Sequence, residues 1–245
     1  MDLQHSTALV TGAASGLGAA TARALADRGV DVLALDLATL PDEEHITYVS
    51  ADVTDEEQVA AALARVDAPL RLVVNCAGIA PAVRLLSSKG VHDLSTFRRT
   101  IDVNLVGTFN VLRLAAELMA TNEPLADGAR GLIVNTASVA AYEGQIGQVA
   151  YAASKGAIVG MTLPAARDLA KYGIRVNTIA PGIVLTPLLT ALGDTVVDSL
   201  SASVPFPARL ARPDEYAQLV LMLADHDYLN GETIRMDGAL RMAPR

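Results

Sequence analysis

A tyrosine and a lysine lie four residues apart in the segment Tyr151-Ala-Ala-Ser-Lys155. At this spacing two side chains share one face of a helix. A phenol has a pKa near ~10 and is a weak base at neutral pH. A nearby ammonium would favour its ionised form. Tyr151 could then take the proton of an alcohol while hydride leaves that alcohol. Alone, such a pair is more often an ordinary helix-surface pair.

A serine lies at a position where a second polar side chain could hold the oxygen of the alcohol. Ser138 follows an apolar run in the segment Asn135-Thr-Ala-Ser138. The run reads as a buried strand, and ligands bind at the carboxyl ends of strands in α/β proteins. We therefore expect the Ser138 hydroxyl to hold the substrate oxygen beside Tyr151.

Glycines are concentrated near the N-terminus, in the segment Thr11–Gly18 (TGAASGLG). Gly12, Gly16 and Gly18 lie between a predicted strand and a predicted helix. Glycines there allow a sharp turn, a close approach of phosphate to the backbone and tight packing of helix on strand. The start of the following helix offers free N–H groups to a pyrophosphate. The alternative is a tight turn that is glycine-rich by chance.

An aspartate ends the next predicted strand, 18 residues after Gly18. A carboxylate at Asp36 can accept hydrogen bonds from both adenosine ribose hydroxyls and would repel a 2′-phosphate. The sequence has no arginine or lysine between Arg28 and Arg65 to receive such a phosphate. The residues therefore favour NAD over NADP as the cofactor. The alternative is a solvated aspartate at a strand end.

Small residues end the fourth predicted strand, in the segment Asn75-Cys-Ala-Gly78. Ala77 and Gly78 are small enough to let the adenosine half of a dinucleotide pass. Cys76 has no basic neighbour in sequence that would activate its thiol, so we interpret it as a packing residue.

Short apolar runs alternate with helical segments along the chain, and these elements must position the polar residues. We expect strands at 7–11, 30–36, 47–50, 70–75, 131–136, 174–180 and 233–237. We expect helices at 16–28, 55–66 with Thr54 as N-cap, about 97–119, 149–171 and 213–223. Strands that alternate with helices indicate a parallel sheet covered on both faces. The sequence predicts one α/β domain over 1–245, with long loops at 81–90 and 185–207.

Composition excludes several classes of protein. The chain has 245 residues, 51 % of them apolar, with a net charge of −8 and one cysteine. Disorder is excluded by the apolar fraction, and the acidic balance disfavours nucleic acid and membrane surfaces as partners. A single cysteine fits a reducing compartment, and no leader pattern is visible, so we expect the cytoplasm. The four histidines lack metal-ligand spacing, so no metal site is expected.

An ordered set of motifs over essentially the whole chain resembles the short-chain dehydrogenases/reductases. The set comprises Thr11–Gly18, Asn75–Gly78, Asn104, Ser138, Tyr151 with Lys155, and Pro181-Gly182. The resemblance implies a Rossmann-like, doubly wound parallel sheet of seven strands with helices on both faces. It implies a catalytic tetrad in which the asparagine holds a water that relays protons to the lysine, and the lysine also contacts the nicotinamide ribose. The tetrad residues are Asn104, Ser138, Tyr151 and Lys155.

Other stretches resemble one subgroup, the type II 3-hydroxyacyl-CoA dehydrogenases, which are also called type 10 17β-hydroxysteroid dehydrogenases. These stretches are 102–105, 122–124, 135–169, 204–207 and 237–242. The subgroup implies oxidation of the 3-hydroxyl group of a 3-hydroxyacyl-CoA with NAD, reversibly and in fatty acid metabolism. Hydroxysteroids and other secondary alcohols are further substrates that it implies. Gln148 would face the substrate and Gln145 would line the same mouth, although both also fit an ordinary polar loop.

The resemblance also implies the residues around the cofactor. Pro181 and Gly182 would line the nicotinamide, and Thr186 would contact its carboxamide or the phosphates. The full expected set is Gly12, Ser15, Gly16, Leu17, Gly18, Asp36, Asp52, Val53, Cys76, Ala77, Gly78, Tyr151, Lys155, Pro181, Gly182, Val184 and Thr186.

Two other functions stay open at this point. An NADPH-dependent 3-oxoacyl-carrier-protein reductase shares the motifs, but it would want basic residues for the 2′-phosphate and for the acidic carrier. A dinucleotide-binding scaffold without catalysis is disfavoured because all four tetrad positions are filled. The helices predicted at 97–119 and 149–171 are apolar on more than one face, so part of each must be buried elsewhere. The family resemblance implies a homotetramer formed through these helices and the last strand.

Overall fold

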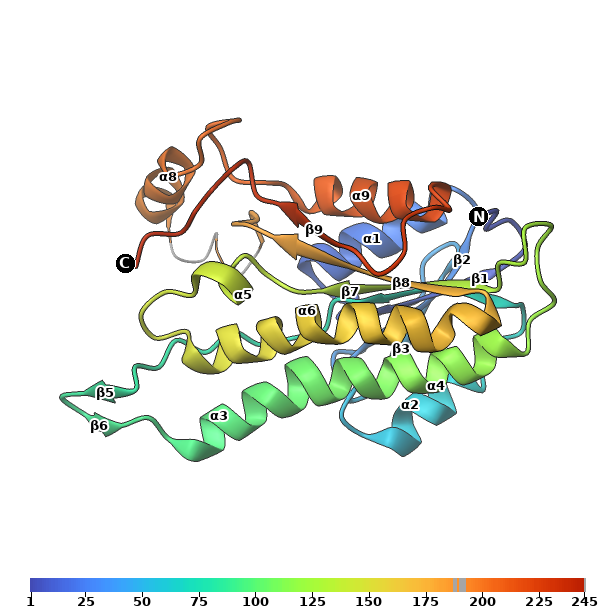
Figure 1. The fold of residues 1–245 in the computed structure, drawn as a ribbon, viewed down its shortest axis with the longest axis horizontal. Helices are drawn as coiled ribbons and strands as arrows, with labels where there is room; N and C mark the ends of the chain where they lie inside the picture. The colour runs from blue at the N-terminus through green and yellow to red at the C-terminus, as the bar shows by residue number, and fades with distance from the viewer. Residues whose placement is uncertain (187–188, 190–192, 245) are drawn as a thin grey trace.

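The computed structural model describes residues 1–186, 189 and 193–244. Seven parallel strands form one sheet in the order β3-β2-β1-β4-β7-β8-β9 (Figure 1). Residues of β4 and β7 are buried at every position, which explains their nearly continuous apolar runs. The predicted seven-stranded parallel sheet is confirmed. The strands are β1 (Thr7–Thr11), β2 (Asp31–Asp36), β3 (Ile46–Ser50), β4 (Leu70–Asn75), β7 (Gly131–Thr136), β8 (Ile174–Pro181) and β9 (Thr233–Met236).

Helices cover both faces of the sheet, as Figure 1 shows. On one face, α1 (Gly16–Ala26) and α9 (Pro213–Asp225) pack on alternate strand residues such as Val10. On the other face, a second apolar core joins residues such as Leu9 to three helices. These are α2 (Glu56–Leu63), α4 (Thr108–Ala120) and α6 (Val149–Leu169), the last followed by the 3₁₀ turn η2 (Ala170–Tyr172).

The order of the strands determines where a ligand can enter. β1 pairs with β2 on one side and with β4 on the other, so successive connections run in opposite directions from β1. At such a switch point, the loops leaving the carboxyl ends of neighbouring strands separate and leave a crevice. The glycine-rich turn after β1 and the small residues after β4 both lie at this crevice.

One long helical segment runs from residue 94 to residue 120 and contains a change of winding. It consists of α3 (Leu94–Ile101), a π-helix η1 (Asp102–Gly107) and α4. The segment starts earlier than the predicted residue 97 because the Asp93 side chain caps it by accepting from the Thr96 N–H at 3.0 Å. By length and composition it could cross a membrane, but half of the tested window is buried inside the fold. Core helices pass the same test, so this is weak evidence for a membrane span.

The predicted N-cap of α2 is wrong by one residue. The cap is Asp55, whose carboxylate accepts from the Gln58 backbone N–H at 3.0 Å and from its side-chain amide at 2.8 Å. Thr54 instead donates its hydroxyl to Asp52 at 2.8 Å. A carboxylate that reaches two donors outcompetes the hydroxyl of its neighbour for the cap position.

Regions predicted as loops contain short elements. The segment 81–90 leads into a hairpin of β5 (Leu86–Ser87) and β6 (Gly90–Val91), and α8 (Asp194–Ala202) lies within 185–207. A further helix, α5 (Ala140–Glu143), separates β7 from α6. The hairpin, α5 and α8 all lie beyond the carboxyl ends of the strands (Figure 1). They therefore surround the end of the sheet where the candidate site residues gather.

Candidate active site

The glycine-rich turn brings backbone close to backbone. Gly12 has φ +66°, and a Cβ there would lie 2.8 Å from the Ala77 nitrogen. A Cβ at Gly18 would collide with the Gly12 carbonyl. The Thr11 hydroxyl accepts from the N–H groups of Cys76 and Ala77, each at 3.1 Å. These contacts join the turn after β1 to the end of β4 and leave space for backbone only.

Asp36 joins the same turn to the end of β2. Its carboxylate accepts from the Ala14 N–H at 3.0 Å and from the Ala38 N–H at 3.1 Å. Each carboxylate oxygen can accept a further hydrogen bond. Asp36 therefore holds the turn and also presents a negative charge at the rim of the crevice.

A cleft of about 770 Å³ lies at the switch point between β1 and β4. Most of the expected cofactor residues line it, and they come from five separate segments of the chain. Gly18 lies buried beneath it, and Tyr151, Lys155, Pro181, Gly182 and Val184 lie outside its lining. The expected residues that line it are Gly12, Ser15, Gly16, Leu17, Asp36, Asp52, Val53, Cys76, Ala77, Gly78 and Thr186.

Two arginines enter the cleft from α3, and the sequence interpretation missed them. Arg98 and Arg99 line the cleft together with Ser95 and Asp102 of the same helical segment. Both arginines lie in the helix predicted at about 97–119, which also carries Asn104, and this shared helix is the signal that the sequence offers. Basic residues are absent between Arg28 and Arg65, the stretch of chain next to Asp36, but this says nothing of residues farther along the chain. The fold brings a distant helix to the same cleft.

Cys76 forms part of the cleft floor, and its thiol contacts two hydroxyl groups below that floor. Its Sγ lies 3.7 Å from the hydroxyls of both Thr136 and Tyr216, and those two hydroxyls lie 2.7 Å apart. Burial raises the pKa of the Cys76 thiol, and these hydroxyl contacts only partly oppose the shift. A thiol with a raised pKa is a poor nucleophile, in line with the interpretation of a packing residue.

The segment 181–186, which we call the Gly182 wall, leaves β8 and closes one side of the site. Its first residue, Pro181, accepts from the Val139 N–H at 2.9 Å. The Gly182 N–H donates to the Met236 carbonyl at 2.9 Å, and Val184 pairs with Ala211 in an isolated bridge. Thr186 lies over the glycine turn, with its Cγ2 3.5 Å from the place of a Cβ on Gly16.

The segment 138–148, which we call the Ser138 wall, leaves β7 beside the Gly182 wall, where the Val139 N–H bonds Pro181. Ser138 is 9 % exposed and its Oγ accepts from the Ala140 N–H at 3.1 Å. Burial raises the pKa of the Tyr151 phenol, and a hydrogen bond with Ser138 lowers it by a smaller amount. Ser138 and Tyr151 are therefore neighbours, as the sequence predicts. Burial therefore disfavours the ionised form of the Tyr151 phenol in the ligand-free protein.

Lys155 is buried one helical turn beyond Tyr151. Its ammonium donates to the Thr136 carbonyl at 2.7 Å and lies 5.8 Å from the centre of the Tyr151 ring. Burial lowers the pKa of Lys155 to about 8. The two side chains thus face each other, as their spacing predicts, and the last carbonyl of β7 fixes the lysine.

Asn104 lies within the π-helix, a winding that is frequent at functional sites. Its Oδ1 accepts from the Ile79 N–H at 2.8 Å, and its Nδ2 donates to the Ile79 carbonyl at 2.9 Å and to Ser154 Oγ at 3.0 Å. A Cβ at Gly78 would lie 3.1 Å from Asn104 Oδ1 and 3.7 Å from Lys155 Nζ, so both side chains converge on Gly78. Both amide hydrogens of Asn104 are used, so its side chain has no donor left for a water.

The two glutamines expected to meet the substrate hold the Ser138 wall in shape. The Gln148 Oε1 accepts from the Gln145 N–H at 2.9 Å. The Gln145 side chain donates to the Ala243 carbonyl of the C-terminal segment at 3.0 Å. Both glutamines bond within the loop or to the tail in this ligand-free structure, and their contact with the substrate stays a prediction.

Comparisons with known proteins agree with this geometry. A family model described as short chain dehydrogenase matches residues 6–196. A 3-hydroxyacyl-CoA dehydrogenase type-2 of Drosophila melanogaster is 53 % identical, over 99 % of this chain and 100 % of its own length. A crystal structure of a 3-hydroxyacyl-CoA dehydrogenase type-2 from Mycobacterium avium superposes with a TM-score of 0.95 at 42 % identity, covering 99 % of this chain and 98 % of that one. A 3-oxoacyl-[acyl-carrier protein] reductase from Brucella melitensis superposes with a TM-score of 0.86 at 32 % identity, covering 98 % and 93 %.

The buried ammonium makes stability depend on pH in a definite direction. The folded-state pKa of Lys155 is about 8, against 10.5 for an unperturbed lysine, so the unfolded chain binds more protons between these values. Stability contributed by this group therefore rises with pH across that window, by up to about 3 kcal/mol. We expect wild type to gain stability relative to Lys155→Met between pH 8 and pH 10.5, measured by urea unfolding without ligand. A Lys89→Met control, which removes an exposed lysine, should show no such trend; a flat difference for Lys155→Met would contradict the assignment.

Proposed function

This chain belongs to the short-chain dehydrogenase family, and from that premise we propose that it oxidises the 3-hydroxyl group of a 3-hydroxyacyl-CoA with NAD and reduces 3-oxoacyl-CoA in reverse. The chain is an oxidoreductase that uses a nicotinamide dinucleotide. The observation that carries the proposal is the meeting of Ser138, Tyr151 and Lys155 at the end of the sheet beside the cleft. The substrate class follows from relatives that bear the name 3-hydroxyacyl-CoA dehydrogenase type-2 and match over nearly their full length.

The residues of the cleft fit a dinucleotide. Ser15 gives α1 no side-chain cap, so the N–H groups of its first turn are available to a pyrophosphate. The turn at Gly12 and Gly18 leaves room for phosphate next to backbone. Asp36 would accept hydrogen bonds from the ribose hydroxyls, and Pro181 to Thr186 would hold the nicotinamide end. When bound, the nicotinamide accepts hydride from the carbinol carbon of the substrate.

Proton transfer falls to Tyr151. Ser138 holds the substrate oxygen, and the Tyr151 phenolate takes its proton as the carbinol carbon loses hydride. Burial alone raises the pKa of the Tyr151 phenol and thus opposes this role. The Lys155 ammonium at 5.8 Å from the ring and the positive charge of the oxidised cofactor act in the opposite direction. The site is therefore built so that Tyr151 becomes a base when the oxidised cofactor is present.

A Tyr151→Phe variant tests this chemistry. We expect NADH formation from 3-hydroxybutyryl-CoA to fall by about 10²–10⁴-fold, because general base catalysis is worth that much. NAD affinity should be retained, since the ring remains. Tyr48→Phe is the matched control, since it removes a tyrosine hydroxyl that bonds Glu43 at the far edge of the sheet. An unchanged rate for Tyr151→Phe would refute the mechanism, and wild type without turnover on any secondary alcohol would favour the scaffold alternative.

The choice of NAD over NADP rests on Asp36. An Asp36→Asn variant keeps an acceptor for the Ala14 N–H but removes the charge that repels a 2′-phosphate. We expect the preference for NAD to fall by about tenfold, equivalent to ~1.4 kcal/mol. Arg98 and Arg99 line the same cleft and would help the variant take NADP. The measurement is kcat/KM with each cofactor, and Asp31→Asn, at the other end of β2, is the control. A tenfold preference of wild type for NADPH would instead support the carrier-protein reductase.

We also propose a homotetramer. Large apolar side chains remain exposed on the long helices, with Val106 at 45 %, Phe109 at 49 % and Leu163 at 44 % exposure. Apolar surface on one side of paired helices is typical of an interface between subunits. Sedimentation at micromolar concentration should give a tetramer for wild type and a smaller species for Phe109→Glu, which places a charge in that face. A monomeric wild type would refute the proposal.

A further inference from the structure

A cluster of four charged side chains joins the two walls of the active site. We call Glu143, Arg235, Asp237 and Arg241 the Arg235 cluster. Arg235 on β9 makes a bidentate pair with Glu143, with both bonds at 2.8 Å, and its Nε donates to Asp237 Oδ2 at 2.7 Å. It also donates to the Leu240 carbonyl at 3.1 Å. One guanidinium thus ties α5, β9 and the C-terminal segment together.

The cluster is sheltered and geometrically specific. The Arg235 side chain is 22 % exposed, that of Glu143 is 25 % exposed and that of Asp237 is 8 % exposed. The Tyr142 ring centre lies 5.0 Å from the Arg235 guanidinium carbon. A planar guanidinium that bonds two carboxylates fixes direction as well as distance. Arg241 is 60 % exposed and reaches Asp237 at 3.1 Å and Glu143 at 3.7 Å, so it adds little to Arg235.

Each carboxylate of the cluster is associated with a different wall: Glu143 is part of the Ser138 wall, and Asp237 packs against the Gly182 wall. Glu143 ends α5 in the middle of the Ser138 wall, between Ser138 and Gln148. Asp237 supports the Gly182 wall, since a Cβ on Gly182 would lie 2.9 Å from the Asp237 Cα. Arg235 therefore donates hydrogen bonds both to a residue of the Ser138 wall and to the residue packed on Gly182. Arg241 reaches Glu143 only as an ion pair at 3.7 Å.

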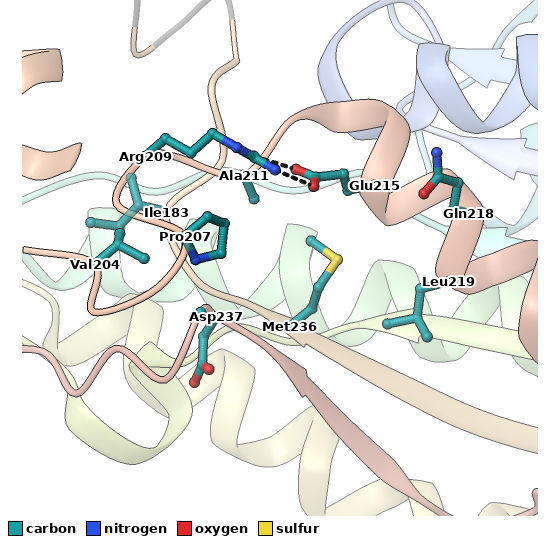
Figure 2. Close-up of a pocket in the computed structure, with 11 residues that line it drawn as sticks. Ile183, Val204, Pro207, Arg209, Ala211, Glu215, Gln218, Leu219, Met236 and Asp237 are labelled. Atoms are coloured by element: carbon teal, nitrogen blue, oxygen red, sulfur yellow. Dashed lines mark hydrogen bonds and ion pairs between the residues drawn. The ribbon is translucent and has the colours of Figure 1, made fainter.

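Packing alone does not hold the Gly182 wall from behind. A cavity of about 430 Å³ lies behind it, lined by Ile183, Ala211, Leu219 and Met236 among others. Figure 2 shows Pro207 and Met236 beside this cavity, while the carboxylate of Asp237 turns away from it. Among residues 1–186, 189 and 193–244, no side chain fills this space, so apolar packing supports this part of the wall less. Directional bonds at its edges have to set its position.

The Ser138 wall is attached at several places, and its helix α5 also packs on α6, where a Cβ on Gly144 would lie 2.8 Å from the Ala152 Cβ. Its base is fixed to β8 by the bond from Val139 N–H to the Pro181 carbonyl at 2.9 Å. Its far end is bonded to the C-terminal segment, from Gln145 to Ala243 at 3.0 Å and from the Ile146 N–H to Pro244 at 3.1 Å. The Arg235 pair with Glu143 lies between these two attachments. The Gly147 carbonyl also accepts from the Val83 N–H at 2.8 Å. Loss of the Arg235 pair would therefore leave Ser138 in place and loosen the middle of the wall around Glu143.

We propose that Arg235 is a positioning residue that holds the Ser138 wall against the Gly182 wall and thereby determines the affinity of the site for its acyl substrate. This rests on the proposed function for the identity of the substrate. Arg235 acts through Glu143 and Asp237 and does not touch the reacting atoms. Because Ser138 is held separately at the base of its wall, removal of Arg235 affects substrate binding more than the chemical step.

The test is an Arg235→Met variant, which keeps a long side chain at this position but removes its hydrogen bonds to Glu143 and Asp237. We expect the KM for 3-hydroxybutyryl-CoA to rise by about tenfold while kcat stays within about twofold, since uniform binding is lost and the catalytic groups stay. Arg235→Lys keeps the charge without the bidentate geometry and should recover part of the affinity. Glu143→Gln should raise KM similarly, and the double variant should be no worse than either single variant.

The control is Arg113→Met, which breaks an ion pair of 2.8 Å with Glu56 between α4 and α2, outside the Ser138 wall and the Arg235 cluster. It should leave KM unchanged. Hydrogen exchange of the peptide 138–148 supplies a second measurement that needs no substrate. Exchange should quicken in Arg235→Met and stay unchanged in Arg113→Met.

The outcomes separate this inference from the proposed function. Unchanged exchange at 138–148, or an unchanged KM in an active enzyme, overturns the role of Arg235 and leaves the dehydrogenase assignment intact. Wild type without activity on 3-hydroxyacyl-CoA overturns the proposed substrate, while the exchange experiment still decides whether Arg235 holds the wall. A loss of kcat with no change in KM or exchange also overturns the inference.

Discussion

The buried ammonium of Lys155 is the constraint on which the rest of the site depends. A charged group taken out of water needs an acceptor of good geometry, and here the acceptor is the Thr136 carbonyl at 2.7 Å. That carbonyl is the last of β7, so the sheet itself fixes the lysine. Tyr151, one turn earlier on α6, and Ser138, two residues after the strand, are then positioned by the same strand and helix.

The cleft depends on glycines, because the absence of a side chain lets two backbone segments approach each other closely. Gly12 packs against the end of β4, and Gly78 lets Asn104 and Lys155 converge. The π-helix around Asn104 turns its amide toward Ile79, so the segment after β4 is bonded to the long helix on both its N–H and its carbonyl. The walls of the cleft are thus joined by hydrogen bonds between segments, while the apolar cores lie deeper, on the two faces of the sheet.

Local patterns in the sequence predict the sheet, the main helices and the pairing of Tyr151 with Lys155, because strand burial and helical spacing depend on near neighbours. The N-cap of α2 was misplaced because Thr54 and Asp55 both suit a cap, and only their contacts distinguish them. The hairpin and α8 lie in segments where the sequence predicts long loops, and α5, with four residues, is too short to show a helical period. Arg98 and Arg99 in the cleft, and the pairing of Glu143 with Arg235, depend on segments that the fold brings together. No local pattern records such contacts.

The Arg235 cluster shows why a site of this kind uses charges where apolar packing would be stronger. Partly exposed ion pairs contribute little to the free energy of unfolding, and a buried pair is weak evidence for stability. Apolar contacts, however, are not directional, and the cavity behind the Gly182 wall leaves that wall without them over part of its back. A bidentate pair allows one distance and one orientation. The cluster is therefore suited to fixing the separation of the two walls, while the cores of the sheet supply the stability of the fold.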